Sequence, residues 1–412
     1  VRLAAGLARL LALFPPDGAF GVSGHAHLDL GWLWPVHETR RKSRRTFETV
    51  LTLMDRFPDF TFNGSSAQVY AWLEEQHPDL FERVRARVLE GRIEPVGGMW
   101  VEPDANMLGG ESWARQLLYG QRYFREKFGR TSRVAWLPDT FGFTPALPQL
   151  LLAAGVTGFF TTKLNWSETT VFPHDLFTWE GLDGSRVLAH SFRNHTWGVE
   201  GLGTYNGDLS PTHLRPVWQD FRGRALPVWD GGAPESLFTY GYGDGGGGPS
   251  AEMLERFERL REYPASPRLR HTRVDDFFDG LPRDGLPVWS GELYLELHRA
   301  TLSSQGRTKK LHREAEHRLV EAEVTSSLAT WQGGDPRPDP SLEAAWKALL
   351  LAQFHDILPG SSIREVYEDA EPALRGVVDT ATRARDAALA ALSDGTEGTF
   401  TVVNPDARDR PL

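Results

Sequence analysis

The alternation of short apolar runs with longer helical patterns between about residues 18 and 290 constrains the fold of this 412-residue chain most strongly. Because strands that alternate with helices are typical of βα units, this order predicts a parallel sheet. We therefore expect an α/β fold over residues 1–295, in the form of a (β/α) barrel of the seven-stranded type. The runs that predict strands lie at 20–23, 92–96, 132–137, 156–162 and 236–242.

Past about residue 300 the sequence contains long helical patterns. Two of them, at 308–331 and 341–357, are separated by a breaker rich in Gly, Asp and Pro at 333–340. A third starts at Ser362, where Ser362 and Glu365 fit a capping box, and reaches about residue 392. We expect a three-helix bundle over residues 296–395.

The last residues have the pattern of a strand, at 399–405. A single strand needs partners. We therefore expect residues 396–412 to hold the first strand of a β-sandwich domain that is otherwise absent from this chain.

Charge and composition exclude several classes of protein. The chain has 45 Lys and Arg against 55 Asp and Glu, a net charge of -10, and its basic residues are scattered, so we expect no nucleic-acid partner. The basic run at 40–45 predicts a solvated helix face. The absence of cysteine excludes disulfides, thiolate metal sites and a cysteine nucleophile, so any metal must be held by His, Asp or Glu.

The longest apolar stretches, such as residues 3–14, are too short to span a bilayer. That stretch also lacks a basic leader and a clear cleavage site. We expect no membrane partner and a cytoplasmic location.

Four short segments carry residues suited to chemistry. His25, His27 and Asp29 alternate just after an apolar run, so side chains two residues apart can meet one metal ion. A cap on a strand end is the alternative. Asp139 follows another strand pattern, at the end where α/β barrels place their chemistry, or else it serves as a helix N-cap.

The other two segments supply one further acid and one further histidine. Asp244 lies in a glycine-rich loop that permits close approach to a ligand, although a plain flexible turn fits as well. A phosphate loop is a weak alternative, since no Gly-Lys-Ser or Gly-Lys-Thr follows. His355 lies near the end of an apolar helical pattern, where a structural role beside the helix dipole is the alternative.

Together the segments provide two isolated acids, a His-x-Asp pair and a further histidine. A retaining glycosidase needs one carboxylate as nucleophile and one as acid/base, about 5 to 5.5 Å apart. Asp139 and Asp244 fit those two roles.

These segments resemble the signature segments of glycoside hydrolase family 38, the α-mannosidases, and they occur in the order of that family. The resemblance rests on residues 25–29, 139–142, 243–248 and 354–356, and extends to 97–106 and 292–299, which are closest to the cytosolic and vacuolar branch. It covers about residues 20 to 405.

The resemblance implies a retaining, zinc-dependent hydrolysis of terminal α-linked mannose in oligosaccharides or N-glycans by double displacement. It implies Asp139 as nucleophile and Asp244 as general acid/base. It also implies one Zn²⁺ per chain, with Co²⁺ as an alternative, and His25 in a supporting position behind the ligands. The implied metal ligands are His27, Asp29, Asp139 and His355.

The predicted partner is thus a mannose-containing oligosaccharide, and a homo-oligomer is compatible with the sequence. Trp32 and Phe141 are the aromatic candidates for the wall of the sugar pocket. Lys163, Glu296 and His298 are candidates for binding sugar hydroxyls, together with Asn165 and Trp166, and a surface or packing role is equally open for each.

Two alternatives stay open at this point. A metal-dependent carbohydrate deacetylase has a similar barrel and a His/Asp site that activates water. A catalytically inactive sugar-binding fragment is the other, because family members continue into β-sandwich domains.

Overall fold

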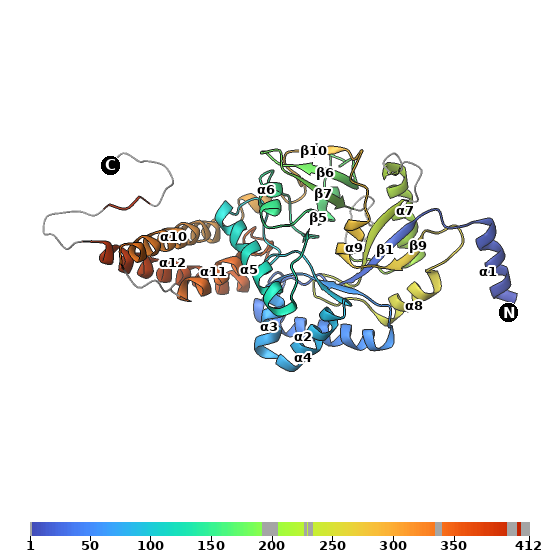
Figure 1. Ribbon diagram of the computed structural model, residues 1–412, viewed down its shortest axis with the longest axis horizontal. Helices are drawn as coiled ribbons and strands as arrows, with labels where there is room; N and C mark the ends of the chain where they lie inside the picture. Colours follow the sequence, from blue (N-terminus) through green and yellow to red (C-terminus); the bar gives the residue numbers. More distant parts are fainter. Residues whose placement is uncertain are drawn as a thin grey trace.

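The computed structural model describes residues 2–191, 205–225, 229, 234–333, 340–393 and 402–404. Its strands gather in the middle of the molecule, while α1 projects from one end and α10 to α12 from the other (Figure 1). The helices are α1 Arg2–Leu13, α2 Val36–Arg56, α3 Ala67–Gln76, α4 Pro78–Leu89, α5 Gly110–Phe128, α6 Leu147–Ala153, α7 Pro211–Ala225, α8 Ala251–Leu260, α9 Val274–Asp279, α10 Gly306–Trp331, α11 Pro340–Ala352 and α12 Arg364–Leu392. The strands are β1 Ala19–His25, β2 Phe62–Gly64, β3 Ile93–Pro95, β4 Val134–Trp136, β5 Gly158–Thr161, β6 Leu176–Glu180, β7 Arg186–Ser191, β8 Glu235–Tyr240, β9 Arg268–His271 and β10 Val288–Ser290.

The first sheet is parallel and has the order β3-β2-β1-β8, with β9 also paired to β1. Strand β1 lies at its centre, and all of its residues after Ala19 are buried. Gly24 pairs with Phe62 on one side and with Tyr240 on the other. The sequence pattern located β1 through its small and apolar residues, which suit a strand that is buried on both faces.

The second sheet has the order β10-β6-β7-β5-β4, in which only β6 and β7 run antiparallel. No ladder joins the two sheets within the described ranges, although the Gly97 amide beyond β3 donates to the Val134 carbonyl of β4 at 3.1 Å. The α/β class with parallel strands is therefore confirmed, whereas closure into a seven-stranded barrel stays a prediction.

Each of the five runs predicted as strands overlaps one, namely β1, β3, β4, β5 and β8. The sequence pattern missed β2, β6, β7, β9 and β10. Three of these, β2, β9 and β10, have only three or four residues, but so do β3, β4 and β5, so length alone does not explain the misses. The basic run at 40–45 lies on α2, as expected.

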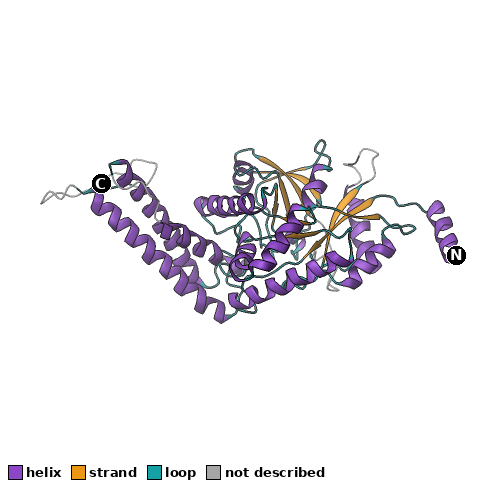
Figure 2. Cartoon of the chain, turned by 60° about the horizontal axis from the view of Figure 1, so that its bottom comes forward, coloured by secondary structure: helices purple, strands orange, loops and turns teal. Residues whose placement is uncertain are grey.

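Helices α10, α11 and α12 lie side by side (Figure 2). Two details of this region differ from the prediction. Helix α11 ends at Ala352, so residues 353–357 are not helical. Helix α12 begins at Arg364 with Ile363 as its N-cap, and the Ser362 hydroxyl donates instead to the carbonyls of Gly31 and Asp356 at 3.0 and 2.9 Å. The predicted capping box is therefore wrong.

The predicted strand at 399–405 lies mostly outside the described residues, and 402–404 form no strand. Among the described residues, no helix is both long enough and apolar enough to cross a membrane.

Replacing either of two helical glycines by alanine should change the free energy of unfolding, in opposite directions at the two positions. A Cβ atom at Gly120 of α5 would lie 2.4 Å from the backbone carbon of Met99 and 2.5 Å from the Gly98 carbonyl oxygen, whereas Gly376 of α12 has no atom within 4 Å of that position. We expect Gly120→Ala to lower the free energy of unfolding by about 1–3 kcal/mol. Gly376→Ala should raise it by up to about 1 kcal/mol. Urea unfolding followed by circular dichroism measures both, and equal effects would contradict the packing around α5.

Candidate active site

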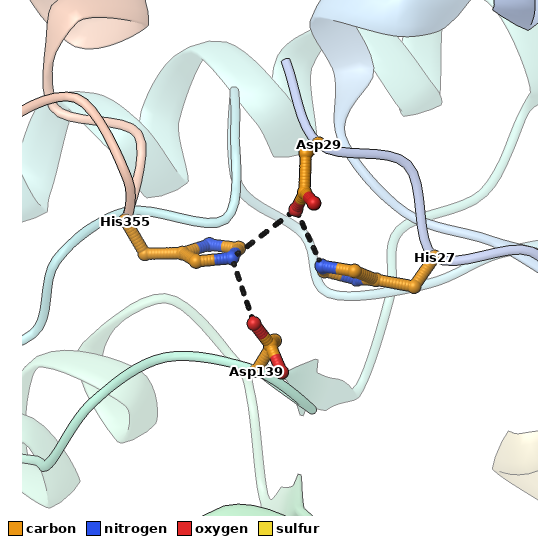
Figure 3. A group of neighbouring side chains, drawn as sticks. All are labelled: His27, Asp29, Asp139 and His355. Atoms are coloured by element: carbon orange, nitrogen blue, oxygen red, sulfur yellow. Dashed lines mark hydrogen bonds and ion pairs between the residues drawn. The ribbon is translucent and has the colours of Figure 1, made fainter. Parts of the chain in front are cut away.

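Side chains from separate parts of the chain meet just beyond the ends of the parallel strands. His27 and Asp29 follow β1, and Asp139 follows β4. His355 comes from the turn after α11, and Figure 3 shows the four side chains pointing toward one another. One candidate ligand atom from each of the four lies within 4.8 Å of all the others, and all but the half-buried Asp139 are buried.

The distances within this cluster suit a single cation. The His27 Nε2 atom lies 2.9 Å from Asp29 Oδ1, and His355 Nε2 lies 3.7 Å from the same oxygen. His355 Nε2 also lies 3.6 Å from Asp139 Oδ2. Burial lowers the pKa of His355, but Asp139 and Asp29 raise it well above its usual value. The cluster therefore favours positive charge at its centre.

The second ring nitrogen of His355 has a partner that suits metal ligation, whereas that of His27 has a carboxylate beside it but makes no hydrogen bond. His355 Nδ1 lies 2.9 Å from the Glu102 carbonyl, which leaves the buried Nε2 without a hydrogen bond and facing the carboxylates. His27 Nδ1 lies 3.4 Å from Glu102 Oε2. Metal-binding histidines commonly give their second nitrogen to a carbonyl or carboxylate. The donor set of two imidazoles and two carboxylates thus fits a zinc ion.

Asp139 is held in its charged form. Burial alone raises the pKa of its carboxyl group, but Lys163, His355 and His27 together hold that pKa well below the usual range. Lys163 follows β5, its Nζ atom lies 2.7 Å from Asp139 Oδ1, and it also lies over the Trp166 ring at 3.5 Å. Because a helix begins only at Leu147, the alternative that Asp139 is an N-cap is excluded.

Asp244 is in a different environment. It follows β8 with a φ of 56°, which directs the chain back so that its carbonyl accepts the Asp29 amide at 2.8 Å. Burial raises the pKa of Asp244, and the hydroxyl of Tyr205, which donates to its carboxylate, partly opposes this. The nearby carboxylates of Asp29 and Asp139 raise it further. Asp244 is therefore the acid that keeps its proton to higher pH.

Both acids line one cavity of about 290 Å³. A larger hollow of about 550 Å³ between α5 and α6 contains none of the residues of the cluster, so we assign the chemistry to the smaller cavity. Its lining residues are Asp29, Trp32, Asp139, Phe141, Lys163, Trp166, Tyr205, Asn206, Asp244, His298, Asp356 and Ser361.

Most of the candidate substrate residues lie at this cavity, namely Trp32, Phe141, Lys163, Trp166 and His298. Glu296 does not line it, because its carboxylate accepts the amides of Glu168 and Thr169 at 2.9 and 2.8 Å. Glu296 instead anchors the loop that contains Glu168 and Thr169. His25 lies behind the cluster, where its Nδ1 is 3.3 Å from the Asn63 carbonyl, and burial lowers its pKa to about 3.

The sequence reasoning missed Asn206 and Ser361, which line the cavity, and three further residues at the site. Glu102 is buried against His27, Tyr205 contacts Asp244, and Asp356 lines the cavity, where burial beside Asp29 raises its pKa to about 7. Glu102 and Asp356 lay within segments already noted for their resemblance, so an acid at those positions was a usable signal. Tyr205 follows no strand or motif, and its contact arises only from the fold.

The sequence matches two family profiles and is similar to known α-mannosidases. The profile of the "Glycosyl hydrolases family 38 N-terminal domain" matches residues 19–292, and that of the "Alpha mannosidase middle domain" matches residues 296–392. The chain is 40% identical over 374 residues to the Alpha-mannosidase of Saccharomyces cerevisiae, an alignment that covers 87% of this chain and 33% of that protein. It is 40% identical over 386 residues to Alpha-mannosidase 2C1 of Homo sapiens, covering 92% and 36%.

The chain therefore spans about a third of the length of these curated relatives. A crystal structure of an alpha-mannosidase from Enterococcus faecalis V583 has the same fold, with a TM-score of 0.74 at 21% identity over 91% of this chain and 43% of that one. Because the N-terminal family profile covers more than half of the sequence and includes the three site segments that follow strands, the chain belongs to glycosyl hydrolase family 38.

Proposed function

We propose that this chain carries the active site of a retaining, zinc-dependent α-mannosidase that removes terminal α-linked mannose from oligosaccharides. The observation that carries the proposal is the contrast between two acids in one cavity. Asp139 is held ionised between Lys163 and the histidines, whereas the pKa of Asp244 is raised. A pair of carboxyl groups with opposite shifts is the arrangement that double displacement at a sugar requires.

We assign His27, Asp29, Asp139 and His355 as the residues that hold the ion. When bound, zinc supplies a positive centre that orients sugar hydroxyls and helps keep Asp139 ionised. Glu102 orients the ring of His355 through its carbonyl, and its carboxylate lies 3.4 Å from His27 Nδ1. The protein thus provides an ordered set of ligands before substrate arrives.

Asp139 is the nucleophile in this scheme. Its carboxylate attacks the anomeric carbon while Lys163, at 2.7 Å, stabilises its charge and orients it. Asp244 donates its proton to the leaving oxygen in the same step. Asp244 then removes a proton from the water that hydrolyses the mannosyl ester on Asp139, and the configuration is retained.

The walls of the cavity suit a hexose. The rings of Trp32, Phe141 and Trp166 line it, and such surfaces pack against the apolar faces of sugars. Asp29, Lys163 and Asp356 line it as well and can bind hydroxyl groups. A metal-dependent deacetylase would leave Asp244 and its Tyr205 contact without a role, so the structure gives less support to that alternative.

Metal removal should abolish turnover. We expect release of p-nitrophenol from p-nitrophenyl α-mannoside to stop after dialysis against a chelator and to return with Zn²⁺ or Co²⁺. Proton NMR should show α-mannose as the first product, since two displacements retain configuration. The assay belongs on the longest natural polypeptide that contains these 412 residues. No turnover there with either metal supplied would refute the mannosidase proposal.

The leaving group should distinguish the two acids. Asp139→Ala should lower kcat by several orders of magnitude on every substrate, because the nucleophile is lost. Asp244→Ala should lose roughly 10² to 10⁴ in kcat/KM on an oligosaccharide but much less in kcat/KM on 2,4-dinitrophenyl α-mannoside, whose leaving group needs no proton. Because Asp244 also serves as the base of the second step, kcat falls on both substrates. Equal losses in kcat/KM on both substrates, measured by steady-state kinetics, would remove Asp244 from the acid role.

The dependence of activity on pH should change when the Tyr205 hydroxyl is removed. Its hydroxyl donates to the Asp244 carboxylate and so stabilises the anion, which lowers the pKa of Asp244. Activity requires protonated Asp244 and is lost as pH rises through its pKa. Tyr205→Phe should raise that pKa and move the alkaline limb of kcat/KM to higher pH. A limb that stays in place or moves to lower pH would contradict the assignment.

A further inference from the structure

A buried network of polar side chains lies directly behind His355. It joins α5, α10 and the turn after α11, and its members are Ser112, Gln116, His312, Glu316 and Gln353, all of them buried. None of these side chains lines the catalytic cavity. Buried polar groups of this kind hold one geometry when every partner is present.

Gln116 of α5 connects two segments that flank His355. Its Nε2 donates to the Gln353 side chain at 3.1 Å and to the Leu350 carbonyl at 3.0 Å. Its Oε1 accepts the Val101 amide at 3.0 Å. Val101 precedes Glu102, whose carbonyl receives both the backbone amide and the ring Nδ1 of His355. Gln116 thus holds both sides of the contact that orients this ligand.

Gln353 completes the connection from the other side. Its Nε2 donates to the Ser112 hydroxyl at 2.9 Å and to His312 Nε2 at 3.0 Å. Burial lowers the pKa of His312 to about 4, so its ring is neutral and can accept. The Gln353 carbonyl accepts the Asp104 amide at 2.8 Å, which bonds the main chain of the turn to the segment after β3.

We propose that Gln116 and Gln353 are positioning residues that set the affinity for the metal by fixing the turn that carries His355. The inference rests on the proposed metal site. Groups that hydrogen-bond directly to a ligand change metal affinity by about 10- to 100-fold when removed. Gln116 and Gln353 act one step further out, through Val101, Glu102 and the turn, so the lower end of this range is expected. Coupling is reciprocal, so metal binding should in turn tighten the contact between the helical segment and the sheets.

A purely structural role is the competing explanation, and the same interface offers a matched control. Arg115 of α5 forms a two-point ion pair with Glu323 of α10, and Glu323 also accepts from the Trp346 indole at 3.0 Å. This pair joins the same helices without touching the turn of His355. Glu323→Gln should therefore lower stability without changing metal affinity.

The test measures Zn²⁺ affinity by competition with a chromophoric chelator, with the melting temperature of the metal-free protein recorded for each variant. Gln353→Met and Gln116→Met keep side-chain volume and remove the hydrogen bonds. We expect each to bind Zn²⁺ about 10-fold more weakly than the unaltered chain, the lower end of the range for direct partners of a ligand. Glu323→Gln should stay within about twofold of it, since its contacts lie away from the ligands.

A Gln353→Met protein that melts lower but binds Zn²⁺ as tightly as the unaltered chain would overturn the inference. Should the methionine variants not fold, Ser112→Ala decides, because it removes one partner of Gln353 and leaves the amide bonds to Gln116. It should weaken Zn²⁺ binding several-fold, and unchanged affinity there counts against the inference. An unaltered chain that binds no Zn²⁺ would instead contradict the proposed metal site itself.

Discussion

The mutual compensation of buried charges is the constraint on which the rest of this structure depends. Asp29, His27 and His355 are almost completely buried, and an unpaired ion at such a depth costs several kcal/mol. Each charge therefore needs a partner, and the partners come from β1, β4, β5 and the turn after α11. The cluster can form only when the sheets and the helical segment are packed together, so the site and the fold are stabilised jointly.

The same electrostatics separates the roles of the two acids. Asp139 faces Lys163 and two histidines, so its pKa falls, whereas Asp244 is buried near other carboxylates, so its pKa rises. Neither pKa shift arises from the local sequence around the aspartate, because the groups that cause it come from distant parts of the chain. Two residues of one type are therefore suited to different roles, because Lys163 and His355 act on Asp139, whereas burial dominates at Asp244.

Sequence patterns located the strands that carry the site, because apolar runs end in polar residues where β1, β4 and β8 stop. They could not locate Tyr205, whose contact with Asp244 joins positions 39 residues apart. The two roles left open for Glu296 could not be separated for a related reason: an acid beside the site looks the same in sequence whether it faces a sugar or the amides of Glu168 and Thr169. In both cases the position of the side chain depends on contacts between residues far apart in the sequence.

The end of α11 shows how such pairing overrides local pattern. The apolar period runs past Ala352, yet the Gln353 amide still bonds four residues back, to Leu349, whereas the Phe354 amide bonds only three back, to Leu351. The His355 amide leaves the helix and donates to Glu102. Had the helix continued, that amide would bond Leu351, and the imidazole could not place Nδ1 on the Glu102 carbonyl with Nε2 toward Asp29 and Asp139. Ending the helix early is therefore what makes His355 available as a ligand.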